Sequence, residues 1–168
     1  MDWVDELSLG WKKEYPQLEF SSLSPLVRLA RLSTVMDGVQ NDVLEPFELT
    51  SSDYGVLATL RRAGRPYALS PSQLHAQLRR SSGGMTKILK RLEASGLIER
   101  KSDVEDGRKI QVTLTARGRS LHDRVFRAFV AASDRLLTDL TIRQKTEIDH
   151  ALKQLHDQLE HLEDGETA

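Results

Sequence analysis

The sequence predicts a mainly α-helical protein of the α+β class, with one β-hairpin after the middle of the chain. Apolar residues recur at spacings of three and four over most of the 168 residues, which is the helical pattern. Capping residues and prolines bound these segments. Apolar residues cluster or alternate as in strands between about Leu97 and Leu114.

Two helices are predicted in the N-terminal third, each ending before a proline. Trp3, Leu7 and Trp11 lie four residues apart on a short helix that ends before Pro16. A long helix should run from about Ser24 to Glu45. The apolar residues that mark it are Leu26, Val27, Ala30, Val35, Val39 and Val43, with Phe47 directly after Pro46.

Two shorter helices follow, each with a capping signal at its start. Thr50-x-x-Asp53 is like a capping box and begins a helix through about Arg62. Ser70-Pro71 combines a capping serine with proline at the first helical position, and begins a helix through about Leu78. The expected buried residues are Tyr54, Val56, Leu57 and Leu60 on the first helix, and Leu74 and Leu78 on the second.

The next helix separates an apolar face from a basic one. Its apolar residues repeat at helical spacing between about Ser82 and Ser95, and Gly96 ends it. They are Met85, Ile88, Leu89 and Leu92. Lys87, Lys90 and Arg91 fall on the other sides. About three residues separate this helix from the preceding one, the turn length of a helix-turn-helix, whose second helix enters the major groove of DNA.

A β-hairpin follows this helix directly. Leu97-Ile98 and the segment Ile110 to Leu114 have the apolar pattern of strands. The segment Asp103 to Gly107 between them is too polar to bury and contains a turn glycine. The middle of the chain is therefore expected to be a pair of helices leading into a charged hairpin.

Two amphipathic helices are predicted in the C-terminal third, from about Thr115 to Leu137 and from Thr141 to about Leu162, the second capped by Thr141-x-x-Gln144. Their apolar stripes are Leu121, Val125, Phe129, Ala132 and Leu136, then Ile148, Leu152, Leu155, Leu159 and Leu162. Packing within one chain could cover such stripes. Their length, added to that of the long N-terminal helix, favours a homodimer interface.

The net charge of −1 hides a basic segment. Between Arg61 and Lys101 there are ten basic and two acidic side chains, so this segment carries +8 and the remainder −9. A basic segment in an acidic chain favours contact with a polyanion such as double-stranded DNA, because neutralising phosphates releases bound counterions. A solvated charged surface is the other interpretation of such a run.

Several function classes are disfavoured. The absence of cysteine excludes disulfides, thiolate metal sites and a cysteine nucleophile. No apolar run reaches the roughly 20 residues of a membrane span and the start of the chain is acidic, so we expect a cytoplasmic protein without a membrane partner. The five histidines show no HExxH pattern and are expected to be solvated. Glu147 and His150 have a spacing that can serve a metal, but without further ligands we expect neither a metal, a cofactor nor catalytic residues.

From about Leu23 to Leu162 the chain resembles the MarR family of winged helix-turn-helix regulators. The most specific match is the wing, which runs from Leu97 through Asp106 and Arg108 to Gly118. The resemblance implies a homodimer with interlocked terminal helices. The expected division is an N-terminal extension helix at 1–20, a dimerisation helix at 21–48, a winged helix-turn-helix DNA-binding domain at 49–116 and C-terminal dimerisation helices at 117–168.

The expected function is that of a DNA-binding transcriptional regulator. We expect a ligand-responsive repressor that binds a pseudo-palindromic operator as a homodimer. The alternative is a winged-helix protein-interaction module without DNA binding, since a fold alone does not fix a function.

The predicted DNA-binding residues form three groups. Those at the starts of the two motif helices should bind phosphate: Ser70, Ser72, Gln73, Ser81 and Ser82. Those expected to face the groove are Thr86, Lys87, Lys90 and Arg91. In the wing, the resemblance implies that Asp106 orients Arg108 toward the minor groove, with Lys109 nearby, while a surface salt bridge is the alternative for Arg108. Gly83 and Gly84 fit either close approach of the backbone to DNA or a loose or later helix start.

The N-terminal helix resembles the branch of this family that responds to urate and similar planar anions. Trp11, Arg62 and Arg100 stand at positions that match the pocket of that branch, whereas Gly55 replaces its acid and Ile88 replaces an arginine of its recognition helix. We therefore expect a different small anionic or aromatic effector. The alternative for Trp11 is that it anchors the added helix to the dimer core.

Overall fold

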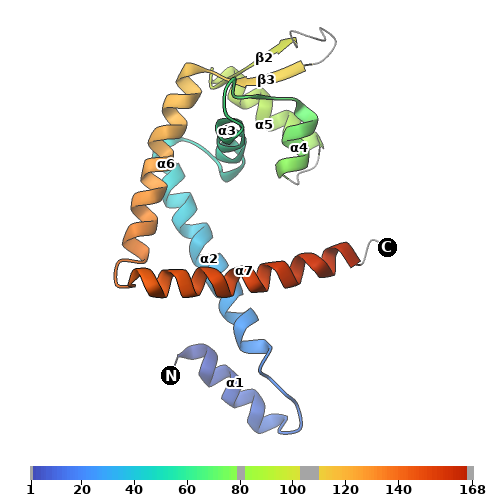
Figure 1. The fold of residues 1–168 in the computed structure, drawn as a ribbon, viewed down its shortest axis with the longest axis vertical. Helices are drawn as coiled ribbons and strands as arrows, with labels where there is room; N and C mark the ends of the chain where they lie inside the picture. The colour runs from blue at the N-terminus through green and yellow to red at the C-terminus, as the bar shows by residue number, and fades with distance from the viewer. Residues whose placement is uncertain (1, 79–81, 103–109, 166–168) are drawn as a thin grey trace. The chain divides into compact units, whose positions relative to one another are not determined.

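The computed structural model describes residues 2–78, 82–102 and 110–165, which form helices and one small sheet (Figure 1). The helices are α1 (Trp3–Glu14), α2 (Leu23–Leu44), the 3-10 helix η1 (Glu45–Phe47), α3 (Ser51–Arg62), α4 (Pro71–Leu78), α5 (Ser82–Ala94), α6 (Ala116–Leu136) and α7 (Ile142–Gly165). The strands are β1 (Ala68–Leu69), β2 (Ile98–Ser102) and β3 (Ile110–Leu114). Residues 1–128 and residues 129–168 form two compact units, and each is described by itself.

The predicted fold class is confirmed: the protein is mainly helical, and α4 and α5 lead into the hairpin of β2 and β3. Each helix expected from the sequence is present, with ends close to the predicted ones. The strands are antiparallel in the order β1-β3-β2, with Ala68 opposite Thr113 and Ile98 opposite Leu114. The sequence pattern gives no sign of β1, because two residues are too few to show alternation. The four-part division of the chain stays a prediction.

The core of the winged domain lies between α3, α4, α5 and the sheet. Its buried members are Val56, Leu57, Leu60, Leu74, Met85, Ile88, Leu89, Leu92, Leu97, Ile98, Val112 and Leu114. The residues predicted to be buried on these helices belong to this set, except Tyr54 and Leu78, which are half-buried. Burial of side chains this large contributes about 1.5–3 kcal/mol each, so the domain has enough apolar surface to hold α5 rigidly.

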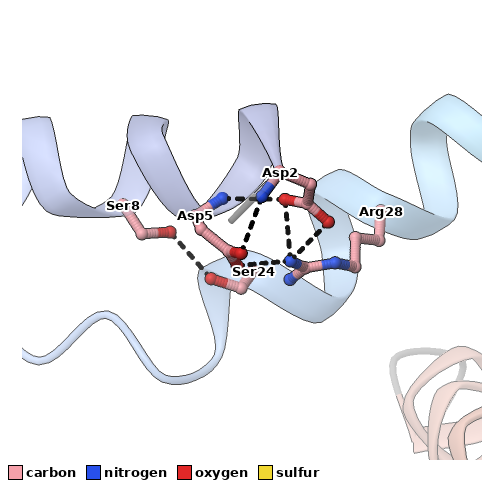
Figure 2. A network of polar contacts seen from close by, with 5 residues as sticks. All are labelled: Asp2, Asp5, Ser8, Ser24 and Arg28. Carbon is pink, nitrogen blue, oxygen red and sulfur yellow. Dashed lines mark hydrogen bonds and ion pairs between the residues drawn. The ribbon is translucent and has the colours of Figure 1, made fainter.

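Polar contacts join α1 to α2 within the first unit (Figure 2). Asp2 and Asp5 form a capping box at the start of α1, and Arg28 of α2 donates from Nη2 to Asp2 Oδ2 at 2.9 Å and to Asp5 Oδ1 at 2.5 Å. Ser8 Oγ and Ser24 Oγ lie 2.7 Å apart. Hydrogen bonds from backbone and from Arg28 lower the pKa of both aspartates. Because these groups are largely exposed, the network orients α1 and adds little stability.

The C-terminal unit consists of the end of α6 and the helix α7. Thr141 caps α7 as predicted: its backbone N donates to Gln144 Oε1 at 2.9 Å, and Gln144 N donates to Thr141 Oγ1 at 3.3 Å. Within residues 2–78, 82–102 and 110–165, none of the helices combines the length and the hydropathy that a bilayer crossing requires.

Candidate nucleic-acid interface

Helix α5 has one buried and one exposed face, as its sequence predicts. Its four apolar residues are buried in the domain core, whereas Thr86, Lys87 and Lys90 are exposed. Lys87 and Lys90 are three residues apart and therefore lie on neighbouring positions of the exposed arc. An exposed pair of lysines on a helix held by a core can contact phosphate or the edges of bases in a groove.

The end of α5 is fixed by a Schellman motif. Gly96 has φ +68°, its N donates to Glu93 O at 2.9 Å, and Leu97 N donates to Leu92 O at 3.0 Å. Leu97 is buried, so the turn also begins the hairpin. The predicted end of the helix at Gly96 is confirmed, and the left-handed backbone explains why glycine stands there.

The start of α4 is closed by its own side chains. Ser70 N donates to Gln73 Oε1 at 2.8 Å, and Gln73 N donates to Ser70 Oγ at 3.2 Å, which is a capping box. Ser70 Oγ and Ser72 Oγ lie 2.9 Å apart. These three residues are thus together at one helix start, as expected, but two of them already serve the cap. Their contact with phosphate stays a prediction.

Arg91 leaves α5 toward α3. Although 52% of its side chain is exposed, Nε and Nη2 donate to Asp53 Oδ1 at 3.0 and 2.7 Å, and Nη2 also donates to Thr50 Oγ1 at 3.3 Å. Asp53 is only 2% exposed. Its Oδ2 accepts from the N and Oγ1 of Thr50 at 3.0 and 2.7 Å, which confirms the predicted capping box of α3. Arg91 therefore has an acidic partner inside the protein, whereas neither lysine forms an ion pair with another residue in the part of the chain that the structure describes.

A pocket of about 500 Å³ opens between α4, α5 and β2. Its lining comprises Pro71, Ser72, His75, Met85, Thr86, Leu89 and Arg100. Arg100 Nε lies 3.2 Å from Glu93 Oε2, an ion pair without hydrogen-bond geometry. Its Nη2 is buried and has no hydrogen-bond partner among the residues that the structure describes. A buried guanidinium nitrogen without a partner, in a pocket with apolar walls, is suited to a carboxylate or another planar anion.

The three predicted ligand residues are not brought together within the first unit. Arg100 lines the pocket, whereas Trp11 and Arg62 do not. Trp11 is 46% exposed on α1, with its ring centroid 5.9 Å from that of Tyr15, and Arg62 is exposed at the end of α3. The ligand role of all three stays a prediction.

The junction between the sheet and α6 is tightly packed. Thr115 Oγ1 donates to Gly96 O at 2.8 Å and accepts from Gly118 N at 3.0 Å, so this side chain caps α6. A Cβ atom on Gly118 would overlap the backbone carbonyl of Leu97. The wing pattern Thr115-Ala-Arg-Gly118 thus has a local physical reason: only glycine lets α6 start this close to the strand.

A stacked cluster lies between α3 and α6. His122 is 7% exposed and its ring stacks on Tyr54 and Phe126, with centroids 5.6 and 5.9 Å away. The expectation that all five histidines are solvated is therefore wrong for His122, because this position of α6 faces α3. His122 Nδ1 lies 3.2 Å from Asp123 Oδ1, and burial raises the pKa of Tyr54.

The pKa of Asp123 is lowered, first by the hydrogen bond that Arg61 Nε donates to Oδ1 at 3.0 Å and then by the contact with His122. Arg61 also lies over the ring of Tyr67, with its guanidinium carbon 5.1 Å from the centroid, and Arg119 lies 5.5 Å from the same centroid. These contacts tie the end of α3 to the loop before β1 and to α6.

Several predicted residues cannot be placed. Ser81 and the wing residues Asp106, Arg108 and Lys109 lie outside the described residues. Ser82 begins α5, so Gly83 and Gly84 lie in its first turn and the later helix start is not observed. Within the ranges that the structure covers, no group of three or more His, Cys, Asp or Glu side chains could hold a metal ion.

Comparisons with known proteins agree on one family. Residues 47–109 match the MarR family. The chain is 31% identical over 145 residues to the HTH-type transcriptional regulator PecS of Dickeya dadantii, covering 86% of this chain and 87% of the relative. It is 32% identical over 127 residues to the HTH-type transcriptional repressor Rv2887 of Mycobacterium tuberculosis, covering 76% and 89%.

A solved structure adds a nucleic-acid complex to these relatives. The crystal structure of a MarR variant from E. coli complexed with operator DNA matches with a TM-score of 0.66 and 26% identity. The match covers 83% of this chain and 99% of that chain. The similarity therefore includes the winged domain and extends well beyond it.

Proposed function

Because the chain belongs to the MarR family of transcriptional regulators, we propose that this DNA-binding protein is a homodimeric, ligand-responsive repressor acting in the cytoplasm. The observation that carries the proposal is the exposed Lys87–Lys90 arc on a helix whose opposite face is buried in the domain core. Two copies of this helix, related by a two-fold axis, would enter successive major grooves, so the operator should be a near-palindrome.

Exposed apolar side chains support the homodimer. On α2, Leu26, Leu32, Val35 and Met36 are 47–56% exposed, and on α7, Ile142 is 84% exposed. Apolar surface of this extent on several helices is typical of a protein interface. A second copy of the chain is the proposed partner, because the structural relatives are regulators of the same overall fold.

The pocket beside Arg100 is the proposed effector site. Its lining includes Thr86 of the recognition helix α5, so an occupant would touch the helix that meets DNA. A small aromatic carboxylate would satisfy the buried Nη2 of Arg100 and place its ring against Met85 and Leu89. Release of DNA requires that the occupied pocket favour a different position of α5.

DNA binding is tested on the duplex upstream of the protein's own coding sequence. Lys87→Gln and Lys90→Gln should each weaken binding and reduce the slope of log affinity against log salt by about one. Lys153→Gln on α7, which is also exposed, is the matched control and should leave both quantities unchanged. A protein-interaction module would bind none of these duplexes with a steep salt dependence, and that result would favour the alternative function.

The effector site is tested with a panel of aromatic carboxylates and urate in a thermal-shift assay. A compound that raises the melting temperature and displaces the duplex should lose both effects in Arg100→Gln. Trp11→Leu separates the two predicted ligand regions: it should leave the response intact if the pocket beside Arg100 suffices. Loss of the response in Trp11→Leu alone would move the site to α1.

A further inference from the structure

The recognition helix α5 is held by ion pairs on both of its flanks. Arg91 and Glu93 are two residues apart, so at about 100° per residue they project toward nearly opposite sides of the helix. Arg91 contacts Asp53 of α3, and Glu93 contacts Arg100 of β2. Lys87 and Lys90 lie on the exposed side, between these two flanks.

The two pairs differ in how tightly they hold. In the first, the Asp53 side chain is 3% exposed and accepts two guanidinium hydrogen bonds. In the second, Glu93 is 41% exposed and meets Arg100 only through a 3.2 Å contact. A buried carboxylate depends on its cation far more than an exposed one, because removing the cation leaves a desolvated charge. The contact between Arg91 and Asp53 is therefore the stronger restraint.

Asp53 offers Arg91 a fixed anchor point. The carboxylate is itself part of the capping box of α3, where its second oxygen accepts from the backbone and hydroxyl of Thr50. Thr50 Oγ1 in turn accepts from Arg91 Nη2. The guanidinium is thus bound at the start of a helix packed in the domain core, and it cannot move away without breaking its own hydrogen bonds to Asp53 and Thr50.

We propose that Arg91 is a positioning residue: held by Asp53, it sets the rotation of α5 about its own axis and so the direction in which Lys87 and Lys90 face the groove. Arg91 itself does not bind DNA. The inference rests on the proposed binding of DNA through α5. Asp53, a buried acid on α3, would then affect operator recognition although it does not lie on the exposed arc of α5.

The contact that holds Arg91 to Asp53 is called the clamp. Two single variants test it by fluorescence anisotropy with the operator duplex and with an unrelated duplex of equal length, over a series of salt concentrations. Asp53→Asn removes the charge that holds Arg91. Arg91→Lys keeps the positive charge but cannot supply two donors in one plane. If Arg91 positions α5, both variants lose operator affinity by at least about tenfold, the size of one lost base contact. The loss is confined to the operator, and the affinity for the unrelated duplex stays unchanged at each salt concentration.

A DNA-binding Arg91 would give the opposite pattern. Asp53→Asn would then release a cation toward the phosphates, and operator affinity would stay equal or rise. Arg91→Lys would keep its phosphate contact, because lysine binds phosphate as a point charge. Operator affinity within about twofold of the wild type in either folded variant overturns the proposal, as does an equal loss on both duplexes.

Controls come from the exposed pair on α7, where Arg143 Nε lies 2.8 Å from Glu147 Oε1. Glu147→Gln and Arg143→Lys match the two chemical changes and should leave DNA binding unchanged. Circular dichroism and thermal melting establish that each variant folds; Arg91→Lys carries the test if Asp53→Asn does not fold. A wild type without operator preference would refute the proposed function and the clamp together, whereas wild-type preference with unaffected variants refutes the clamp alone.

Discussion

Replacing Gly118 by alanine should destabilise the winged domain although alanine is the better helix former. In an open helix the exchange stabilises by about 1 kcal/mol. At Gly118 the new Cβ would overlap the carbonyl oxygen of Leu97 and lie 2.8 Å from Leu114 Cδ1. That carbonyl already accepts from the N and Oγ1 of Thr115, both at 3.1 Å, so it cannot rotate away without breaking these bonds.

The size of the effect follows from these contacts. Overpacking costs about 1–3 kcal/mol and each strained hydrogen bond about 1 kcal/mol, so after the gain in helix propensity a net loss of about 2 kcal/mol is expected. For a chain of this length that lowers the melting temperature by about 4–8 °C.

The assay is thermal unfolding of Gly118→Ala beside Gly55→Ala. At Gly55 the added Cβ meets only Leu78 Cδ2, at 3.4 Å, which is the flexible end of a side chain. This control should therefore melt at or above the wild-type temperature. Equal melting temperatures for the two variants would refute the packing argument, since both are glycine-to-alanine changes within helices.

Two further predictions concern the core and the junction with α6. Leu57→Ala removes a fully buried side chain from α3 and should lower the free energy of unfolding by about 2–5 kcal/mol in denaturant titration, whereas Leu9→Ala, at an exposed position, should change it by less than about 0.5 kcal/mol. Asp123→Asn tests the pH dependence of stability. The hydrogen bond from Arg61 lowers the folded-state pKa of Asp123 below its ordinary 3.8. The ionised carboxylate therefore stabilises the fold fully above about pH 5, and this stabilisation is lost as the pH falls through the lowered pKa. The difference in melting temperature between wild type and Asp123→Asn should therefore be constant above about pH 5 and close in acid, and a difference that widens in acid would contradict the assigned sign.

The local patterns were enough to predict the helices and most of the core, because each rests on neighbours in sequence. The capping box at Thr50, the Schellman glycine at Gly96 and the buried face of α5 follow from spacings of three and four residues. The burial of His122 did not follow, since it depends on which side of α6 meets α3. That is decided by packing between elements far apart in the chain.

The charge of the basic segment shows most clearly that contacts between distant residues do not follow from the sequence pattern. The segment from Arg61 to Lys101 carries +8, and this excess predicted a surface for a polyanion. Three of its arginines are in fact paired with acids: Arg61 with Asp123, Arg91 with Asp53, and Arg100 with Glu93. The first two of these acids lie outside the counted segment, so the charge of that segment alone does not show that Arg61 and Arg91 are paired.

What distinguishes the cations of this segment is therefore their side chain and its neighbours. Arg91 and Arg100 bind carboxylates of the winged domain and Arg61 binds one on α6, so in each case a planar group with several donors links two elements. Lys87 and Lys90 are exposed on α5, where a flexible point charge suits a phosphate or a base edge. The positive charge available to DNA is accordingly smaller than the count suggests, and Lys87 and Lys90 place part of it on the helix that Arg91 is proposed to orient.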